Sequence, residues 1–331
     1  MTVRPDAPLR RKAITTLLGT AALTLLPRPA RSNTYPSGPI RLIVPWAVGT
    51  PADLSGRVLV ERMAAGLGQP FEVENLPGAS GTVGLAEALR RPADGYTVVM
   101  LSSPTLMAPL LYPTRPIDLG TTLDPVGLTV WSYNVLVVPS GSAIGSPLEL
   151  AATARNRDGK VTYSSAGNGT PAHLAAELFR QQTGAPLTHV PYDNFAAALN
   201  DLTTGQVDFM FLTASAAIPL LAAGRLRALA VTGTQRIPAL PAVPTMAEQG
   251  YDRFEMRNFD GMMVRRGPPA EIVQRLNAEL RDALGLPEVR AVLDRLALHP
   301  DPMTPQKFRS VILAESIKWL GIGKAAGMTA A

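Results

Sequence analysis

The chain has 331 residues, which is enough for two α/β domains with sizeable cores. It carries 31 basic and 26 acidic residues, a formal net charge of +5 at pH 7, and no cysteine. The lack of cysteine excludes disulfides, thiolate metal ligands and cysteine nucleophiles. The three histidines, His173, His189 and His299, are not at metal-ligand spacing, so we expect no metal site.

The N-terminal segment has the layout of an export signal. Arg10-Arg11-Lys12 precedes the mostly apolar stretch Ala13–Leu26, and Ala30-Arg31-Ser32 places small residues at both positions needed for cleavage. We therefore expect residues 1–32 to be a signal peptide removed near Ser32, and the mature protein to lie in the periplasm. The adjacent arginines leave the Sec and twin-arginine routes both open.

The positive charge is concentrated in this leader. Its six basic residues and one acidic residue account for the whole net charge of +5, which leaves the mature chain close to neutral. Nucleic-acid binding requires a dense basic face, so we expect no nucleic-acid partner. No apolar run reaches the eighteen or so residues of a transmembrane helix.

The first part of the mature chain alternates between strand and helix patterns. Short apolar runs predict strands at Ile40–Val44, Phe71–Glu74 and Tyr96–Leu101. Helical periodicity predicts one helix that ends at Gly66 or Gly68 and another that ends near Arg91. The βαβαβ order predicts a parallel sheet with loops at the carboxyl ends of its strands.

A second series of strands and helices begins at Val135–Val138. Its further strands are expected as a short strand from Val161 and at Thr188–Val190, Val207–Leu212 and Leu226–Val231. The chain then returns through a proline-punctuated connector to a strand at Phe259–Val264 and three C-terminal helices. We expect an α/β fold with two lobes: residues 33–134 plus 250–331 form lobe 1, and residues 135–249 form lobe 2.

The loop Ser164–His173 between a strand and a helix is the first candidate site. Thr170 suits the helix N-cap, and Pro171 suits the first helical position. The amides of Gly167–Thr170 and of the first turn face the space above the strand, at the positive end of the helix dipole. This construction can hold an anion; a tight turn without any ligand is equally compatible with it.

The same loop supports an alternative function. Gly167-Asn168-Gly169-x-x-Ala172 matches the dinucleotide pattern G-x-G-x-x-A, which would make the protein an exported nucleotide-dependent oxidoreductase with Asp193 as ribose acceptor. No second mononucleotide half is evident, and no nucleophile–base–acid set is visible. We therefore favour a binding protein and expect neither an enzyme nor a bound cofactor.

A second loop, Pro45–Asp53, has the same construction, and Asp53 either contacts a ligand or caps free amides. An amide hydrogen bond to a charged group contributes about 1.5–3 kcal/mol. Micromolar affinity requires roughly 8 kcal/mol. One loop is marginal by this measure, so we expect both loops to face a cleft between the lobes.

Several motifs resemble the tripartite tricarboxylate transporter substrate-binding family, or Bug family. They are Tyr35–Pro45, Glu74–Gly81, Pro92–Thr97, Ser165–His173, His189–Tyr192, Gly224–Val231 and Glu315–Trp319. The resemblance spans Tyr35 to Gly327. It implies a type II-like periplasmic binding protein, with two lobes around a ligand cleft, that captures a small carboxylate for membrane transporter subunits or for sensing.

The resemblance also implies where the carboxylate is held, namely by the loops Val48–Asp53 and Ser164–His173. The candidate ligand-binding residues are Val48, Gly49, Thr50, Asp53, Ser164, Ser165, Ala166, Gly167, Asn168, Gly169, Thr170, His173, Asp193 and Leu212. Leu212 stands where the family commonly has an acidic residue, which argues against amino-acid ligands. We expect the protein to be a monomer.

Overall fold

The structure is a computed structural model that describes residues 35–114, 117–192 and 194–329. The predicted signal peptide at residues 1–32 and the candidate residue Asp193 lie outside the described residues. None of the helices in these three ranges is long and apolar enough to cross a membrane.

Lobe 1 begins with the predicted βαβαβ series, which the structure confirms. Strand β1 lies between β2 and β3 and is parallel to both, with Leu42 opposite Val73 and Val98. These elements are β1 (Ile40–Val44), α1 (Pro51–Leu67), β2 (Phe71–Asn75), η1 (Ala79–Gly81), α2 (Thr82–Arg90) and β3 (Thr97–Ser102). Gly68 ends α1 in the left-handed conformation, as expected for a C-cap glycine.

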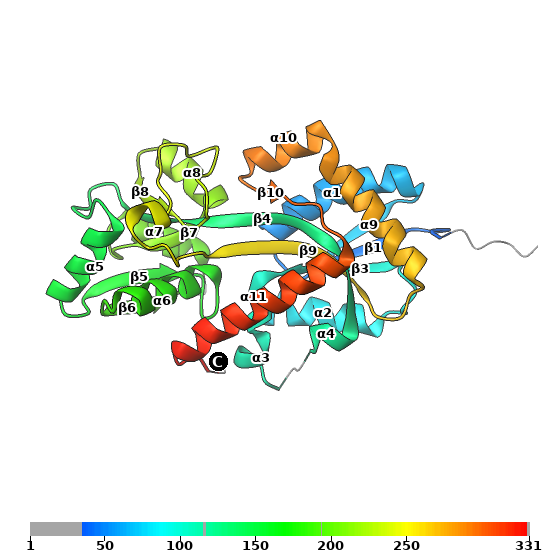
Figure 1. The fold of residues 1–331 in the computed structure, drawn as a ribbon, viewed down its shortest axis with the longest axis horizontal. Helices are drawn as coiled ribbons and strands as arrows, with labels where there is room; N and C mark the ends of the chain where they lie inside the picture. Colours follow the sequence, from blue (N-terminus) through cyan, green and yellow to red (C-terminus); the bar gives the residue numbers. More distant parts are fainter. Residues whose placement is uncertain (1–34, 115–116, 193, 330–331) are drawn as a thin grey trace, which may run out of the picture. The chain divides into compact units, whose positions relative to one another are not determined.

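Two long strands, β4 (Leu123–Pro139) and β9 (Arg257–Arg265), run side by side through the middle of the molecule (Figure 1). Strand β9 is antiparallel to β3 on one side and to the first part of β4 on the other. The second part of β4 continues into the other lobe, where it pairs with β7 and β8. Strand β10 (His299–Pro300) pairs with the outer edge of β4.

The length of β4 corrects the sequence analysis, which predicted a strand only at Val135–Val138. The strand begins twelve residues earlier, at Leu123. Pro125 and Gly127 obscure its start because both residues are poor strand formers. The pairing with β9 shifts its register between these two residues, so they lie at an irregularity in the sheet.

Lobe 2 repeats the strand order of lobe 1. Strands β5 and β6 are parallel, and a bridge between Tyr163 and Phe209 joins them to β7. The order β6-β5-β7-β4-β8 therefore corresponds to β2-β1-β3-β9-β4. The elements are α5 (Pro147–Asn156), β5 (Val161–Ser165), α6 (Pro171–Thr183), β6 (Leu187–Pro191), α7 (Phe195–Thr203), β7 (Met210–Thr213), α8 (Ala214–Ala222) and β8 (Leu226–Val231).

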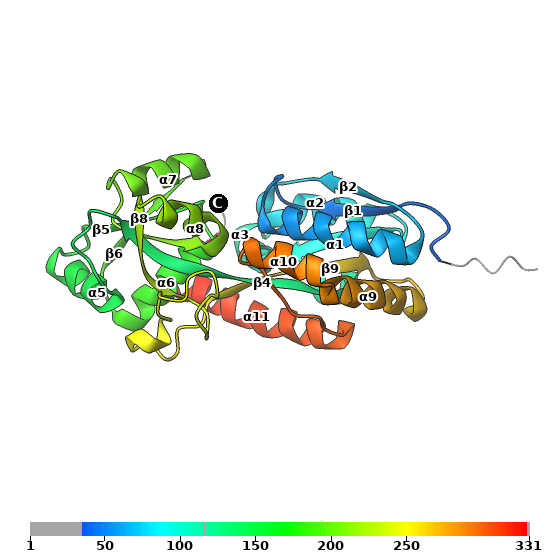
Figure 2. The same cartoon turned by 90° about the horizontal axis from the view of Figure 1, so that it is seen from above.

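The remaining helices of lobe 1 are η2 (Ser103–Met107), α3 (Ala108–Leu111), α4 (Leu119–Thr122), α9 (Ala270–Gly285), α10 (Pro287–Arg295) and α11 (Pro305–Ala325). The short η3 (Ala247–Gln249) lies in lobe 2 after β8, where the Met246 amide donates to the Val231 carbonyl. Helices α1, α9 and α10 share one apolar cluster, and Figure 2 shows them on the same side of the sheet. Helices α2 and α11 contribute to another cluster, which continues into lobe 2 through Phe179 and Phe211. The two lobes thus share part of their core.

Candidate ligand-binding cleft

The two glycine loops have nearly the same geometry. Thr50 and Thr170 are the N-cap residues of α1 and α6, and both have φ −71° and ψ 159°. Each threonine hydroxyl donates a hydrogen bond of 2.8 Å to the carbonyl three residues earlier, Ala47 or Gly167. The predicted N-cap position of Thr170 is confirmed, although its hydroxyl donates to the loop and accepts no amide of the helix.

In the first loop, the buried side chain of Asp53 fixes the backbone. Its carboxylate accepts hydrogen bonds from the Gly49 amide (2.9 Å), Asn75 Nδ2 (2.9 Å) and Arg57 Nε (2.8 Å). Burial by itself would raise the pKa of Asp53, but the bonds from Gly49, Asn75 and Arg57 outweigh it and lower the pKa. Gly49 has φ +84°, which a glycine adopts without strain. Asp53 therefore supports the loop from within.

In the second loop, His173 occupies the position equivalent to Asp53. The Gly169 amide donates to His173 Nδ1 at 3.2 Å, and the imidazole stacks on His189 with ring centroids 3.8 Å apart. Burial lowers the pKa of His173 to about 3 and that of His189 to about 4. His189 Nε2 is 2.7 Å from Ser165 Oγ, which also accepts the Gly167 amide. Both rings are neutral at pH 7 and hold the loop in place.

Some amides of the second loop remain available to a ligand. Within the part of the chain that the structure describes, the amides of Ala166, Asn168 and Ala172 donate to no protein acceptor. They lie at the N-terminal end of α6, where the helix dipole favours a negative charge. An anionic group is the ligand chemistry that these donors suit.

A cavity of about 570 Å³ lies between the lobes beside this loop. Lobe 1 lines it with Trp46, Ser80, Pro104, Leu111 and Tyr112. Lobe 2 lines it with Ala166, Gly167, Asn168, Gly169, Thr170, Pro171, Ala172, Pro191, Phe195, Met210, Phe211, Leu212 and Thr213. Its size is within the usual range for small-molecule sites.

The structure divides the predicted site residues into two groups. Six line this cavity: Ala166, Gly167, Asn168, Gly169, Thr170 and Leu212. Seven do not: Val48, Gly49, Thr50, Asp53, Ser164, Ser165 and His173. The first loop contributes Trp46 in their place, and the Val48 side chain is 72% exposed. Ser165 and His173 are buried beneath the second loop and contact its backbone.

Apart from Leu212, the apolar walls of the cavity were missed by the sequence analysis. Leu111 and Tyr112 come from the end of α3, and Phe195 begins α7. The sequence signal for Phe195 was an aromatic residue directly after Asn194, the N-cap of α7, close to the end of β6. Ser80 was also missed; it has φ +51° within Gly78-Ala79-Ser80-Gly81, where all four residues have positive φ. Such strained backbone is concentrated at functional sites.

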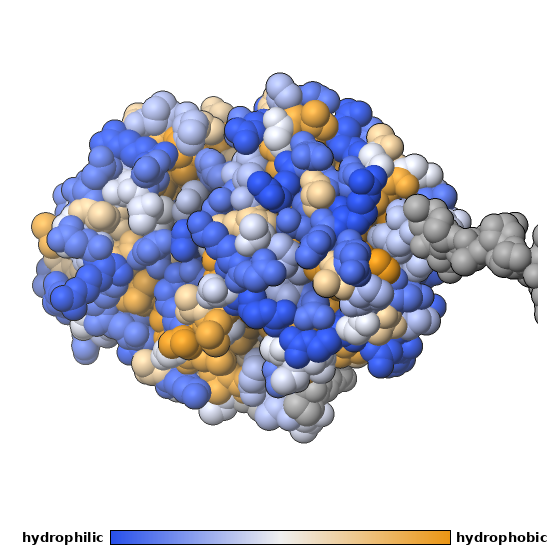
Figure 3. All heavy atoms as spheres, turned by 45° about the vertical axis from the view of Figure 1, so that its right-hand side comes forward, coloured by the Kyte–Doolittle hydropathy of each residue, from blue (hydrophilic) through white to orange (hydrophobic). Residues whose placement is uncertain are grey.

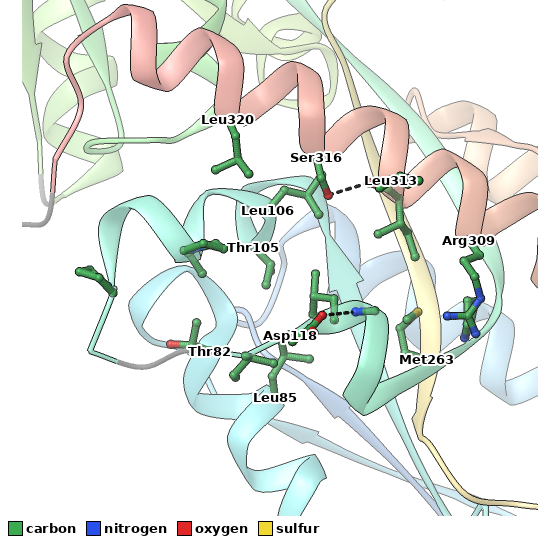
Figure 4. A pocket seen from close by; sticks show the side chains of 18 residues that line it. Thr82, Leu85, Thr105, Leu106, Asp118, Met263, Arg309, Leu313, Ser316 and Leu320 are labelled. Atoms are coloured by element: carbon green, nitrogen blue, oxygen red, sulfur yellow. Dashed lines mark hydrogen bonds between the residues drawn. The ribbon is translucent and has the colours of Figure 1, made fainter.

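A second cavity, of about 680 Å³, lies under α11 (Figure 4). Leu85 of α2, Leu106 of η2 and Leu313 of α11 point into it. Leu313 is 65% exposed, and the otherwise largely hydrophilic face in Figure 3 includes a compact apolar area. Neither glycine loop contributes to the lining. The cleft cavity is therefore the candidate functional site.

Two lobes of equal strand order, joined by crossing strands and with a glycine loop of lobe 2 facing a cavity between them, define a two-lobed α/β binding protein. Residues 56–328 match the family model described as tripartite tricarboxylate transporter family receptor. The chain belongs to this family. Its members are solute-binding receptors, as the resemblance in the sequence implied.

Relatives and solved structures agree with this assignment. The chain is 34% identical over 304 residues to the protein BugT of Bordetella pertussis, covering 90% of this chain and 92% of that protein. A protein of R. palustris solved with adipate has a TM-score of 0.80 and 32% identity, covering 90% of this chain and 100% of that one. MatC from Rhodopseudomonas palustris, with bound malate, has a TM-score of 0.76 and 28% identity, covering 87% of this chain and 99% of that one.

Proposed function

We propose that this protein is a periplasmic solute-binding protein that captures a small organic acid and performs no catalysis. The observation that carries the proposal is the second glycine loop, whose unpaired amides line a cavity between the lobes at the start of α6. The adipate and malate bound to similar structures support a carboxylate as the ligand group. Family membership supports a receptor over an oxidoreductase.

Backbone donors fit a carboxylate well in this setting. Each hydrogen bond from a neutral amide to a carboxylate contributes about 1.5–3 kcal/mol, and the helix dipole adds to this attraction. The lowered pKa values of His173 and His189 keep both rings neutral, so they support the loop without adding charge. In this proposal the first loop, with Val48, Gly49, Thr50 and Asp53, forms the lobe 1 side of the ligand-binding cleft.

The proposal includes the organisation of the chain. Residues 33–134 plus 250–331 form lobe 1 and residues 135–249 form lobe 2, with the crossings in β4 and before β9. Residues 1–32 direct export and are removed near Ser32. The mature protein acts as a monomer that delivers its ligand to membrane transporter subunits, and Asp193 and Leu212 belong to the ligand-binding residues.

A thermal-shift and calorimetry panel tests the function. Small carboxylates should raise the unfolding temperature, and the matching primary amides, which lack the charge, should not. Reduced nicotinamide cofactors, titrated by fluorescence, should not bind. Equal stabilisation by an acid and its amide, or saturable binding of the cofactor, would contradict the proposal.

A further inference from the structure

We propose that the cleft selects organic acids with a single carboxylate and an apolar body, such as medium-chain fatty acids and aryl-alkanoic acids, over di- and tricarboxylates. The inference rests on the proposed function, because it assumes that one carboxylate is held by the second glycine loop. The inference concerns the part of the ligand beyond this carboxylate, which lies against the walls of the cavity.

The walls away from the loop are apolar on both sides of the cleft. Lobe 1 contributes the side chains of Trp46, Pro104, Leu111 and Tyr112, and lobe 2 contributes those of Phe195, Met210, Phe211 and Leu212. Leu111 is 2% exposed, and Met210 and Leu212 are each 1% exposed, so these side chains are fixed by packing. The accessible apolar surface of the walls comes from the half-buried Trp46, Pro104 and Tyr112 and from Phe195, and this surface gains free energy by covering hydrocarbon.

No lysine, arginine, histidine, aspartate or glutamate is found among the described residues that line the cavity. The polar side chains in the lining are neutral: Ser80, Tyr112, Asn168, Thr170 and Thr213. The hydroxyl of Thr170 already donates to the Gly167 carbonyl. A second carboxylate on the ligand would therefore lose its hydration without meeting a cation.

The cost of desolvating a second, unpaired carboxylate is larger than the free energy gained by burying the hydrocarbon of the ligand. Burying an ion without a partner costs far more than the gain from burying a methylene group. Donors at one end of the cavity and apolar walls at the other favour an amphiphilic ligand, with its carboxylate on the loop and its hydrocarbon against Trp46, Tyr112 and Phe195. The ligand class follows from this arrangement.

Hexanoate and adipate make a matched pair, because both have six carbons and differ only in the second carboxylate. In calorimetry at pH 7.5, where carboxyl groups are ionised, hexanoate should bind at least tenfold more tightly than adipate. From butanoate to hexanoate, each added methylene should raise the affinity about three- to fourfold as it becomes buried. Affinities that stay flat along the series would overturn the inference.

Variants at Phe195 test the wall directly, because this side chain is 40% exposed and its replacement should leave the fold intact. Phe195→Arg places a cation in the lining and should reduce the preference for hexanoate over adipate by tenfold or more. Phe195→Ala should weaken hexanoate binding more than adipate binding and so reduce the preference between them. Leu148→Arg is the matched control, since Leu148 on α5 is 67% exposed and does not line the cavity. An unchanged preference in Phe195→Arg would contradict the proposed wall.

The outcomes separate this inference from the function on which it rests. If adipate, malate or citrate binds as tightly as hexanoate or more tightly, the function stands and the apolar selectivity is wrong. If no acid in the panel binds to a folded protein, both are wrong. Tighter binding of hexanoate, with the predicted dependence on chain length, supports both.

Discussion

Gly169 of lobe 2 lies against Leu111 of lobe 1 at the edge of the cleft. It has φ +71°, and a Cβ built at this position would collide with Leu111 Cδ1 of lobe 1. We expect Gly169→Ala to lose about 1–2 kcal/mol of stability from its left-handed backbone. It should also weaken ligand binding, because the added methyl displaces Leu111 from the cavity wall. Chemical denaturation and calorimetry measure the two effects.

Gly184→Ala is the control that separates the backbone strain of a positive φ from the contact with the cavity wall. Gly184 has φ +62° at the C-cap of α6, and a Cβ there meets no atom within 4 Å. This variant should show a similar loss of stability and normal ligand affinity. If both variants bound ligand equally well, the contact between Gly169 and Leu111 would have no role in the site.

His173 and His189 should make the protein less stable in mild acid. Their pKa values are about 3 and about 4 in the folded protein, against 6.5 unperturbed, because burial disfavours the charged ring. Below pH 6.5 the unfolded chain therefore binds more protons than the folded protein does. The contribution of the two histidines to stability falls as the pH decreases towards 4.

The variant His189→Gln should reduce this pH dependence. Between pH 6 and 5 its free energy of unfolding should fall less steeply than that of the wild type, by about 1 kcal/mol per pH unit for the one histidine removed. Urea denaturation at several pH values measures the slopes. Equal slopes in the two proteins would show that burial does not lower the pKa of His189 in the folded protein.

A buried carboxyl group between strands β3 and β9 should make stability depend on pH in the opposite direction. Asp260 on β9 lies opposite Ser102 on β3, and the Ser102 hydroxyl donates a hydrogen bond to its carboxylate. Burial raises the pKa of Asp260 to about 7, although the bond from Ser102 opposes the shift. The folded protein therefore holds a proton that the unfolded chain releases near pH 3.8, and stability falls as the pH rises from about 4 to 7.

Asp260→Asn retains the shape of the side chain and cannot ionise. Relative to the wild type, it should be more stable at pH 8 than at pH 5, because only the wild type has a buried charge at the higher pH. Thermal unfolding of the two proteins at both pH values measures the difference. A difference in stability that is the same at pH 5 and pH 8 would mean that Asp260 does not titrate between these values.

The elements that the sequence predicted well have clear local boundaries. The strand Leu226–Val231 was predicted with its observed bounds because it is a short apolar run after Gly224. The loop Ser164–His173 was recognisable because its glycines, its N-cap and Pro171 are consecutive. The start of β4 was not recognisable, because Pro125 and Gly127 are unusual in a strand and are held there by pairing with β9.

Apart from Leu212, the walls of the cavity could not be predicted in the same way. Leu111 and Gly169 are far apart in the sequence and adjacent in space, and no local pattern encodes that contact. The similarity of the two loops likewise predicted a symmetric site, whereas the first loop lines the cavity only through Trp46. The position of a loop relative to the opposite lobe depends on the packing of the whole molecule.

The lobes are joined at a small polar cluster where the chain crosses between them. Thr232 Oγ1 accepts the Asn134 amide of β4 at 3.0 Å and donates to the Met256 carbonyl, just before β9, at 2.5 Å. Asn258 Nδ2 donates to Asn134 Oδ1 at 3.1 Å. Since both crossings lie side by side here, we expect the lobes to rotate about this cluster as in hinge-type binding proteins.

Ligand should therefore bring the lobes together. In small-angle scattering, a saturating acid identified by calorimetry should decrease the radius of gyration of the mature protein. Gly169→Ala should show a smaller decrease at saturation, because its methyl keeps Leu111 and the second loop apart, and Gly184→Ala should behave like the wild type. A radius that stays constant in the wild type would indicate a rigid cleft, in which Gly169→Ala acts only on the ligand contacts.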